Sequence, residues 1–194
     1  MQTPVNQPLL FLKKFLKHGI TIASITPSTK FLSQRTVAGI DWNQARLVVE
    51  LGAGTGPITQ EIVNRARPEC TVIVIEQDDD FLGILRNRFG HLKHVHIIKS
   101  DCTDLAVQCA KLGLEKVDYV VSGLPTPSLP KHIQKAVFSF YRSHLASTGA
   151  VHQITEFPLL FKPFYKKHFA EVEFTFEPRG IPPAGVYVCR KPKG

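Results

Sequence analysis

A glycine-rich turn between a predicted strand and a predicted helix restricts the fold of this chain most strongly. Residues 50–56 read Glu-Leu-Gly-Ala-Gly-Thr-Gly, after an apolar run at 47–49 and before a helical pattern at 57–67. This order is typical of nucleotide-binding α/β sheets, because glycine lets the backbone approach a ligand closely. A dinucleotide fingerprint, G-x-G-x-x-G, would need glycine where Pro57 stands. The turn therefore predicts a nucleotide-like ligand that is not a dinucleotide.

Strands and helices alternate along the rest of the chain. Strands are predicted near 47–51, 71–76, 94–98, 117–121 and 149–155, with helices near 57–67, 78–88, 103–112 and 131–145. Two last strands, 171–177 and 184–190, have no helix between them and indicate an antiparallel pair. The expected fold class is α/β, a doubly wound, Rossmann-like seven-stranded sheet with its last strand pair antiparallel. N-terminal helices are expected at 8–18 and from Ser28, as N-cap, to near Gly39.

Composition and charge restrict the partners. The chain carries 24 Lys and Arg against 16 Asp and Glu, a net charge of +8, which favours nucleic acid or an anionic membrane surface. No metal site is expected, because the four cysteines form no C-x-x-C pair and the histidines at 91, 94 and 96 lack a suitably spaced partner. We find no membrane-spanning apolar run and no secretory signal. We expect a cytoplasmic protein that could lie peripherally on the inner membrane face, of undetermined oligomeric state.

The glycine turn and its acidic residue resemble the first motif of the class I methyltransferases that use S-adenosylmethionine. In that family the acidic residue lies near the cationic methionine end of the cofactor. The resemblance implies cofactor contacts at the turn and after the next three strands. The residues concerned are Glu50, Gly52, Ala53, Gly54, Thr55, Gly56, Glu76, Gln77, Asp101, Cys102, Ser122, Gly123 and Leu124.

Two of these carboxylates have specific expected roles. Glu76 ends the second strand, where a carboxylate can accept hydrogen bonds from both ribose hydroxyls. Asp101 follows the third strand, where the family holds the adenine amino group. Each also has a simpler interpretation, since Glu76 could cap a helix that begins near Asp78 and Asp101 could cap one near Thr103.

The loop after the fourth strand bears on the methyl acceptor. Ser122-Gly123-Leu124-Pro125 resembles in outline the loop of the ribosomal RNA adenine dimethyltransferases, but Gly123 replaces the polar acceptor and Thr126 the ring that stacks on a base. The chain is more similar to the bacterial phospholipid N-methyltransferases, through segments 11–31, 121–125 and 181–187. That resemblance implies methylation of the amine of phosphatidylethanolamine. The chain departs from this family at residues 153–156, which read Gln-Ile-Thr-Glu where the family tends to have Gln-Phe-Thr-Tyr.

The same resemblance implies a phospholipid substrate and an anionic membrane surface as partners. We divide the chain into an N-terminal helical segment, 1–40, that serves as a lid or membrane contact, and a methyltransferase domain, 41–194. Helix 8–18 and segment 161–169 combine large apolar side chains with lysines, which suits a membrane interface, although the second segment could bind single-stranded RNA. The open alternatives are a methyltransferase for RNA, protein or a small molecule, and a non-catalytic module. No general base stands out, and the weak candidates are Tyr141, His152 and Glu156.

Overall fold

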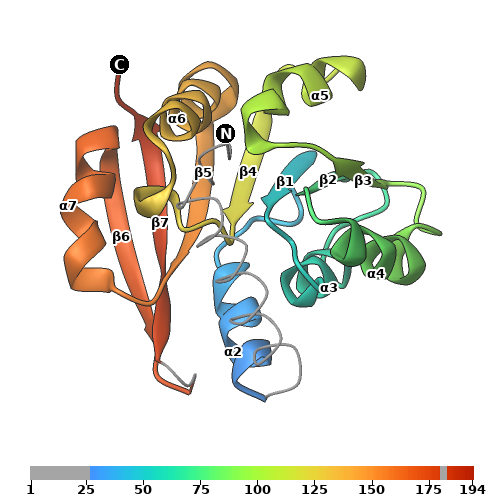
Figure 1. Cartoon of the computed structure of the whole chain (residues 1–194), viewed down its shortest axis with the longest axis horizontal. Coiled ribbons are helices and arrows are strands. Elements are labelled where there is room, and N and C mark those ends of the chain that lie inside the picture. The colour runs from blue at the N-terminus through green and yellow to red at the C-terminus, as the bar shows by residue number, and fades with distance from the viewer. Residues whose placement is uncertain (1–26, 180–182) are drawn as a thin grey trace, which may run out of the picture.

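The computed structural model describes residues 27–179 and 183–194, which form one sheet with helices on both faces (Figure 1). The strands are β1 (Leu47–Leu51), β2 (Thr71–Glu76), β3 (Val95–Lys99), β4 (Val117–Ser122), β5 (Leu145–Thr155), β6 (Phe169–Glu177) and β7 (Ala184–Pro192). The α-helices are α2 (Pro27–Thr36), α3 (Pro57–Val63), α4 (Asp79–Phe89), α5 (Leu105–Lys111), α6 (Lys131–His144) and α7 (Pro158–His168). Short 3-10 helices are η1 (Cys102–Asp104) and η2 (Thr126–Ser128).

The sheet confirms the predicted topology. Its strand order is β3-β2-β1-β4-β5-β7-β6, with β1 to β5 parallel and β7 antiparallel to both β5 and β6. Leu51 at the end of β1 is opposite Ile75 of β2 and Ser122 of β4, and Ser122 is opposite Gln153 of β5. The carboxyl ends of four strands are therefore level, which places the loops that follow them at one edge, where doubly wound sheets bind ligands.

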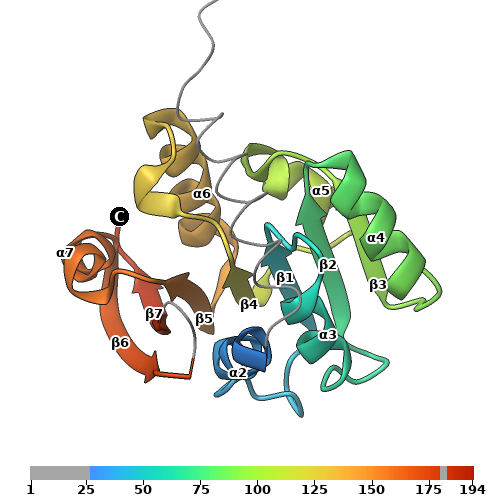
Figure 2. The ribbon, with the colours of Figure 1, turned by 60° about the horizontal axis from the view of Figure 1, so that its bottom comes forward.

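Both faces of the sheet are covered, so the central strands are apolar on both sides. On β1, Leu47, Val49 and Leu51 face the cluster formed with α5, α6 and α7, whereas Val48 faces the cluster formed with α3 and α4. Figure 2 shows α5 and α6 on one side of the sheet and α2 and α3 on the other. This two-sided burial explains the nearly uninterrupted apolar runs of the parallel strands.

Several predicted elements differ in their bounds or were missed. The helix expected at 57–67 ends at Val63, and the one expected at 103–112 is divided into η1 and α5. The strand expected from 149 begins at Leu145, with an irregular register against β4 between Val117 and Tyr119. Segment 158–168 forms α7, a helix that is not predicted from the sequence and that contains Pro163.

The described part of the N-terminal segment packs onto the sheet. Helix α2 contacts α3, β5, β6 and β7 and is followed by a turn through Gly39 at φ +83°. The helix predicted at 8–18 and residues 181 and 182 lie outside the described residues, so the role of segment 1–40 as lid or membrane contact stays a prediction. Within the described ranges, no helix is long and apolar enough to cross a membrane.

Candidate cofactor and acceptor site

The glycine turn after β1 has the backbone conformation that its composition predicts. Gly52, Gly54 and Gly56 have φ values of +71°, +56° and +84°, a region that side chains other than hydrogen disfavour. A Cβ on Gly52 would lie 2.8 Å from Cδ2 of Leu124, and one on Gly56 would lie 2.8 Å from Cδ2 of Leu85 on α4. The first glycine therefore keeps the turn close to the loop after β4, and the third keeps it close to α4.

Glu76 ties the end of β2 to the glycine turn. Its buried carboxylate accepts hydrogen bonds from the backbone N–H groups of Gly54 (2.9 Å), Gln77 (2.8 Å) and Asp78 (3.0 Å). A carboxylate has about four acceptor positions, so one remains for a ligand hydroxyl. The alternative role of Glu76 as the cap of α4 is wrong, because Asp78 is the N-cap and its side chain accepts from the N–H groups two and three residues further on.

Asp101 has the capping role that was the simpler of its two interpretations. Its Oδ1 accepts a hydrogen bond from the N–H of Thr103 at 2.9 Å and caps η1. The described residues provide no hydrogen bond to Oδ2, and Asp101 also lines a pocket at the carboxyl edge of the sheet. Capping and cofactor binding are therefore compatible at this residue.

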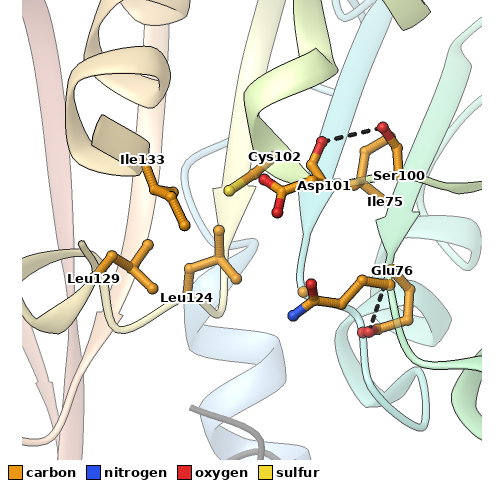
Figure 3. A pocket seen from close by; sticks show the side chains of 10 residues that line it. Ile75, Glu76, Ser100, Asp101, Cys102, Leu124, Leu129 and Ile133 are labelled. Atoms are coloured by element: carbon orange, nitrogen blue, oxygen red, sulfur yellow. Dashed lines mark hydrogen bonds between the residues drawn. The ribbon is translucent and has the colours of Figure 1, made fainter. Parts of the chain in front are cut away.

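That pocket, which we call the cofactor pocket, brings together six residues predicted from the sequence. They are Gly52, Glu76, Gln77, Asp101, Cys102 and Leu124. Four further residues line the pocket and were not predicted from the sequence: Ile75, Ser100, Leu129 and Ile133. Figure 3 shows Leu124, Leu129 and Ile133 on the side opposite Glu76 and Asp101. A cavity with carboxylates on one wall and apolar groups on the other suits a ribose and an adenine ring.

Glu50 lies beneath the turn, outside the lining of this pocket. Its Oε2 accepts a hydrogen bond from the Thr59 hydroxyl of α3 at 2.7 Å, and among the described residues its buried Oε1 has no partner. Burial raises the pKa of Glu50 to about 8. A cation near Oε1 would restore the charged form, so this carboxylate fits the ammonium of a methionine group.

The loop after β4 touches the glycine turn. The N–H of Gly123 donates to the carbonyl of Leu51 at 2.9 Å, and a Cβ on Gly123 would lie 3.0 Å from the carbonyl oxygen of Gly52. Ser122, also predicted at the site, accepts a hydrogen bond from the N–H of Leu124 through its Oγ at 3.3 Å. Gly123 is needed here because of this close backbone approach.

Gln153 on β5 holds this loop, a role that the sequence analysis missed. Its buried side-chain Nε2 is within hydrogen-bond distance of the carbonyl oxygens of Ser122 (3.2 Å), Leu124 (2.8 Å) and Ile154 (3.0 Å). Its Oε1 accepts from the Thr126 hydroxyl at 3.2 Å. Thr126 is thus buried with its hydroxyl used, which leaves no stacking side chain at this position.

A second pocket, the acceptor pocket, lies beside the first and shares Leu124 with it. It is lined by the loop after β4, by the end of β5 and by α7. Phe157, Phe161 and Tyr165 supply aromatic walls, and Glu156 supplies its one carboxylate. Partial burial raises the pKa of Glu156 above its ordinary value. This combination of carboxylate and aromatic faces fits an amine that alternates between charged and neutral forms.

The other two candidate bases lie elsewhere. Tyr141 is buried in the core cluster against α7, and burial raises its pKa far above the ordinary value. His152 faces α2, where its Nδ1 is 2.8 Å from the carbonyl oxygen of Thr36, and burial lowers its pKa to about 4. Neither residue lines the cofactor or acceptor pocket, whereas Glu156 does. The described part of the chain holds no group of three potential metal ligands.

Fold and pockets together define the class of the protein, a Rossmann-like methyltransferase that uses S-adenosylmethionine. The model of a family described as "Methyltransferase domain" matches residues 48–149, and the chain belongs to this family. Among curated proteins, the ornithine lipid N-methyltransferase of Singulisphaera acidiphila is 50% identical over 93% of this chain and 94% of its own length. The resemblance to lipid N-methyltransferases is therefore confirmed.

Two other proteins are more distantly similar to this chain. Ribosomal RNA small subunit methyltransferase A of Mycoplasma mycoides is 35% identical over 48% of this chain and 34% of its own length. The 1,6-didemethyltoxoflavin-N1-methyltransferase of Burkholderia thailandensis, solved with S-adenosylhomocysteine, has a TM-score of 0.66 and 14% identity over 100% of this chain and 94% of its own. The latter supports the fold alone.

Proposed function

We propose that this enzyme methylates the primary amine in the head group of a membrane lipid. The observation that carries the proposal is the acceptor pocket, in which Glu156 and aromatic side chains adjoin the loop shared with the cofactor pocket. Ornithine lipid is the first substrate to test, because a relative with that named activity is 50% identical over nearly the whole chain. Phosphatidylethanolamine, expected from the sequence motifs, offers the same chemistry, a primary amine on an acyl lipid.

The residues of the cofactor pocket would hold S-adenosylmethionine in parts. Glu76 would accept one hydrogen bond from a ribose hydroxyl and Asp101 one from the adenine amino group, whereas Glu50, outside the pocket lining, would face the ammonium from beneath the glycine turn. When bound, this cofactor supplies an electrophilic methyl group on a sulfonium. The chain's own contribution is alignment and removal of water, since methyl transfer needs an amine lone pair in line with the methyl group.

The acceptor pocket would prepare the amine. A lipid amine is protonated at neutral pH and has no free lone pair, so a proton must leave before transfer. Glu156 would accept that proton, and its raised pKa brings it closer to the operating pH, as general base catalysis requires. Phe157, Phe161 and Tyr165 would hold the increasingly methylated cation through their ring faces.

The test is transfer of label from S-adenosylmethionine to defined lipids. Vesicles would contain ornithine lipid, phosphatidylethanolamine, or phosphatidylcholine, whose amine is already fully methylated, with structured RNA assayed in parallel. We expect label in one or both primary-amine lipids and none in phosphatidylcholine. Label in RNA alone, or in no lipid, would overturn the proposal, and the ratio of the two lipid rates would identify the preferred head group.

A further inference from the structure

The first turn of α7 exposes large apolar side chains at the rim of the acceptor pocket. Leu159 is 90% exposed, Leu160 68% and Phe157 57%. The sequence predicts that the aromatic and basic residues of 161–169 contact a membrane interface or single-stranded RNA. Instead Phe161 and Tyr165 line the acceptor pocket, and Phe169 is buried. The apolar surface is thus displaced to the start of the helix, and adjoining exposed apolar groups of this kind mark an interaction site.

The same outer face of α7 is basic. Lys162 and Lys166 follow Leu159 by three and seven residues, so helical spacing places them on the same side of α7 as Leu159. Lys167 follows Leu160 by seven residues and lies on the side of Leu160. No acidic residue occurs within α7. The Nζ of Lys193 donates to the carbonyl of Lys166 at 2.8 Å, which brings a fourth lysine to the end of the helix. An apolar tip followed by lysines matches a bilayer with anionic head groups.

The apolar turn is joined rigidly to the pocket. The N–H of Phe157 donates to the hydroxyl of Thr155 at 3.2 Å, and the hydroxyl of Tyr187 donates to the carbonyl of Pro158. The rings of Phe157 and Phe161 pack edge to face, with their centres 6.1 Å apart. Figure 1 shows α7 at the outer edge of the sheet, where no other described element covers it. Insertion of this turn would therefore hold the pocket mouth at the level of the lipid head groups.

We propose that residues 158–160, with the side chains of Leu159 and Leu160, insert into an anionic bilayer while the lysines of α7 contact lipid phosphates. This inference rests on the proposed function, because it explains how an amine could enter the acceptor pocket while its acyl chains stay in the membrane. The partner is the lipid surface itself, and the turn is the part of the fold that reaches it.

The experiment uses the full chain with Leu159→Ser and Leu160→Ser combined. The matched control is Val107→Ser on α5, which is 53% exposed and lines neither pocket. We expect the double variant to bind phosphatidylglycerol vesicles more weakly, by roughly tenfold or more in co-sedimentation, because two leucine side chains would no longer be buried in the bilayer. Affinity for S-adenosylmethionine and turnover of a short-chain, water-soluble amine lipid should stay at the wild-type level.

A second variant tests the charge. Replacing Lys162, Lys166 and Lys167 by Gln should weaken binding to phosphatidylglycerol vesicles by roughly tenfold or more, and this difference should disappear in about 1 M salt. Vesicle binding by the leucine double variant equal to that of wild type would overturn the inference. If wild type binds vesicles but methylates no amine lipid in either form, the proposed function fails while the membrane contact stands.

Discussion

At the scale of single residues, Glu156 is the side chain on which the proposed proton transfer depends. Because its pKa is raised and the carboxylate is the active form, kcat/KM should increase with pH through that pKa. We expect Glu156→Gln to reduce kcat by roughly 100-fold and to remove this acidic limb from the pH profile. Binding of S-adenosylmethionine, measured by calorimetry, serves as the control. An unchanged acidic limb in the variant would assign it to another group.

Gly52 combines a positive φ with close packing, and the chain offers a matched control. In Gly52→Ala the new Cβ would clash with Leu124, and overpacking of about 1–3 kcal/mol should weaken cofactor affinity by roughly tenfold or more. Gly113 has a similar φ of +68° but no atom within 4 Å of a Cβ. Gly113→Ala should therefore lose only about 1 kcal/mol of unfolding free energy. Equal cofactor affinities for both variants would show that the clash does not matter.

Gln153 is a positioning residue for the loop after β4. Gln153→Ala would leave the carbonyl groups of Ser122 and Leu124 without a buried donor, at about 1–3 kcal/mol of stability. We expect kcat to fall roughly tenfold or more, since small displacements of reacting groups are costly. Gln153→Glu keeps the side-chain volume but places a carboxylate against carbonyl oxygens, so it should restore neither the stability nor kcat. Denaturant unfolding and single-turnover kinetics separate the two effects.

At the scale of elements, α2 is fastened to the end of β6 by a charged cluster. Buried Glu177 pairs with Arg35 at 3.4 Å and with Arg179 at 2.6 Å, and the Arg179 guanidinium lies 3.9 Å from the ring centre of Phe31. Hydrogen bonds from Arg179 lower the pKa of Glu177 to about 2. The folded protein thus binds fewer protons here than the unfolded chain, so this contribution to stability is present above the ordinary pKa and is lost as pH falls toward 2.

This cluster has a measurable signature in acid. The unfolding free energy of wild type should fall between pH 4.5 and about 2. That of Glu177→Gln should be lower and should change less with pH over the same range. His152, whose pKa is lowered to about 4, acts in a separate window, since its stability contribution declines from pH 6.5 downward in both proteins. Denaturant unfolding at each pH checks this. A variant with the same slope below pH 4.5 would contradict it.

Local sequence patterns predict some elements but not others. Strands β1 and β2 were predicted with their observed bounds, because buried parallel strands are short apolar runs between turns. Helix α7 was missed, since Pro163 and the clustered aromatic residues of 157–169 resemble a loop locally. Packing of Tyr165 and Phe169 against α6 and β7 stabilises the helix despite the proline.

At the scale of the whole molecule, cofactor binding should stabilise the fold by mass action. At a free concentration of 100 times Kd, S-adenosylmethionine should add about 2.7 kcal/mol to the unfolding free energy. For a chain of this size, that raises Tm by roughly 5–11 °C. Glu76→Gln should abolish most of the rise, because an amide cannot accept from all three N–H groups and also bind a ribose hydroxyl. Scanning calorimetry of both proteins with and without the cofactor measures this rise in Tm.

The sequence alone determined the sheet topology, the enzyme class and six residues of the cofactor pocket, because each depends on local patterns such as apolar runs, glycine turns and residues that end strands. Only the tertiary structure placed Leu129 and Ile133, which carry no local signal, and only it showed that Gln153, the retained Gln of the motif at 153–156, holds the loop after β4. It also separated Glu156, beside the acceptor pocket, from Tyr141 and His152, whose side chains point into the two sides of the core. The physical reason is that spacing along the chain fixes which strand a residue ends, whereas packing across the sheet decides which side chains share a cavity.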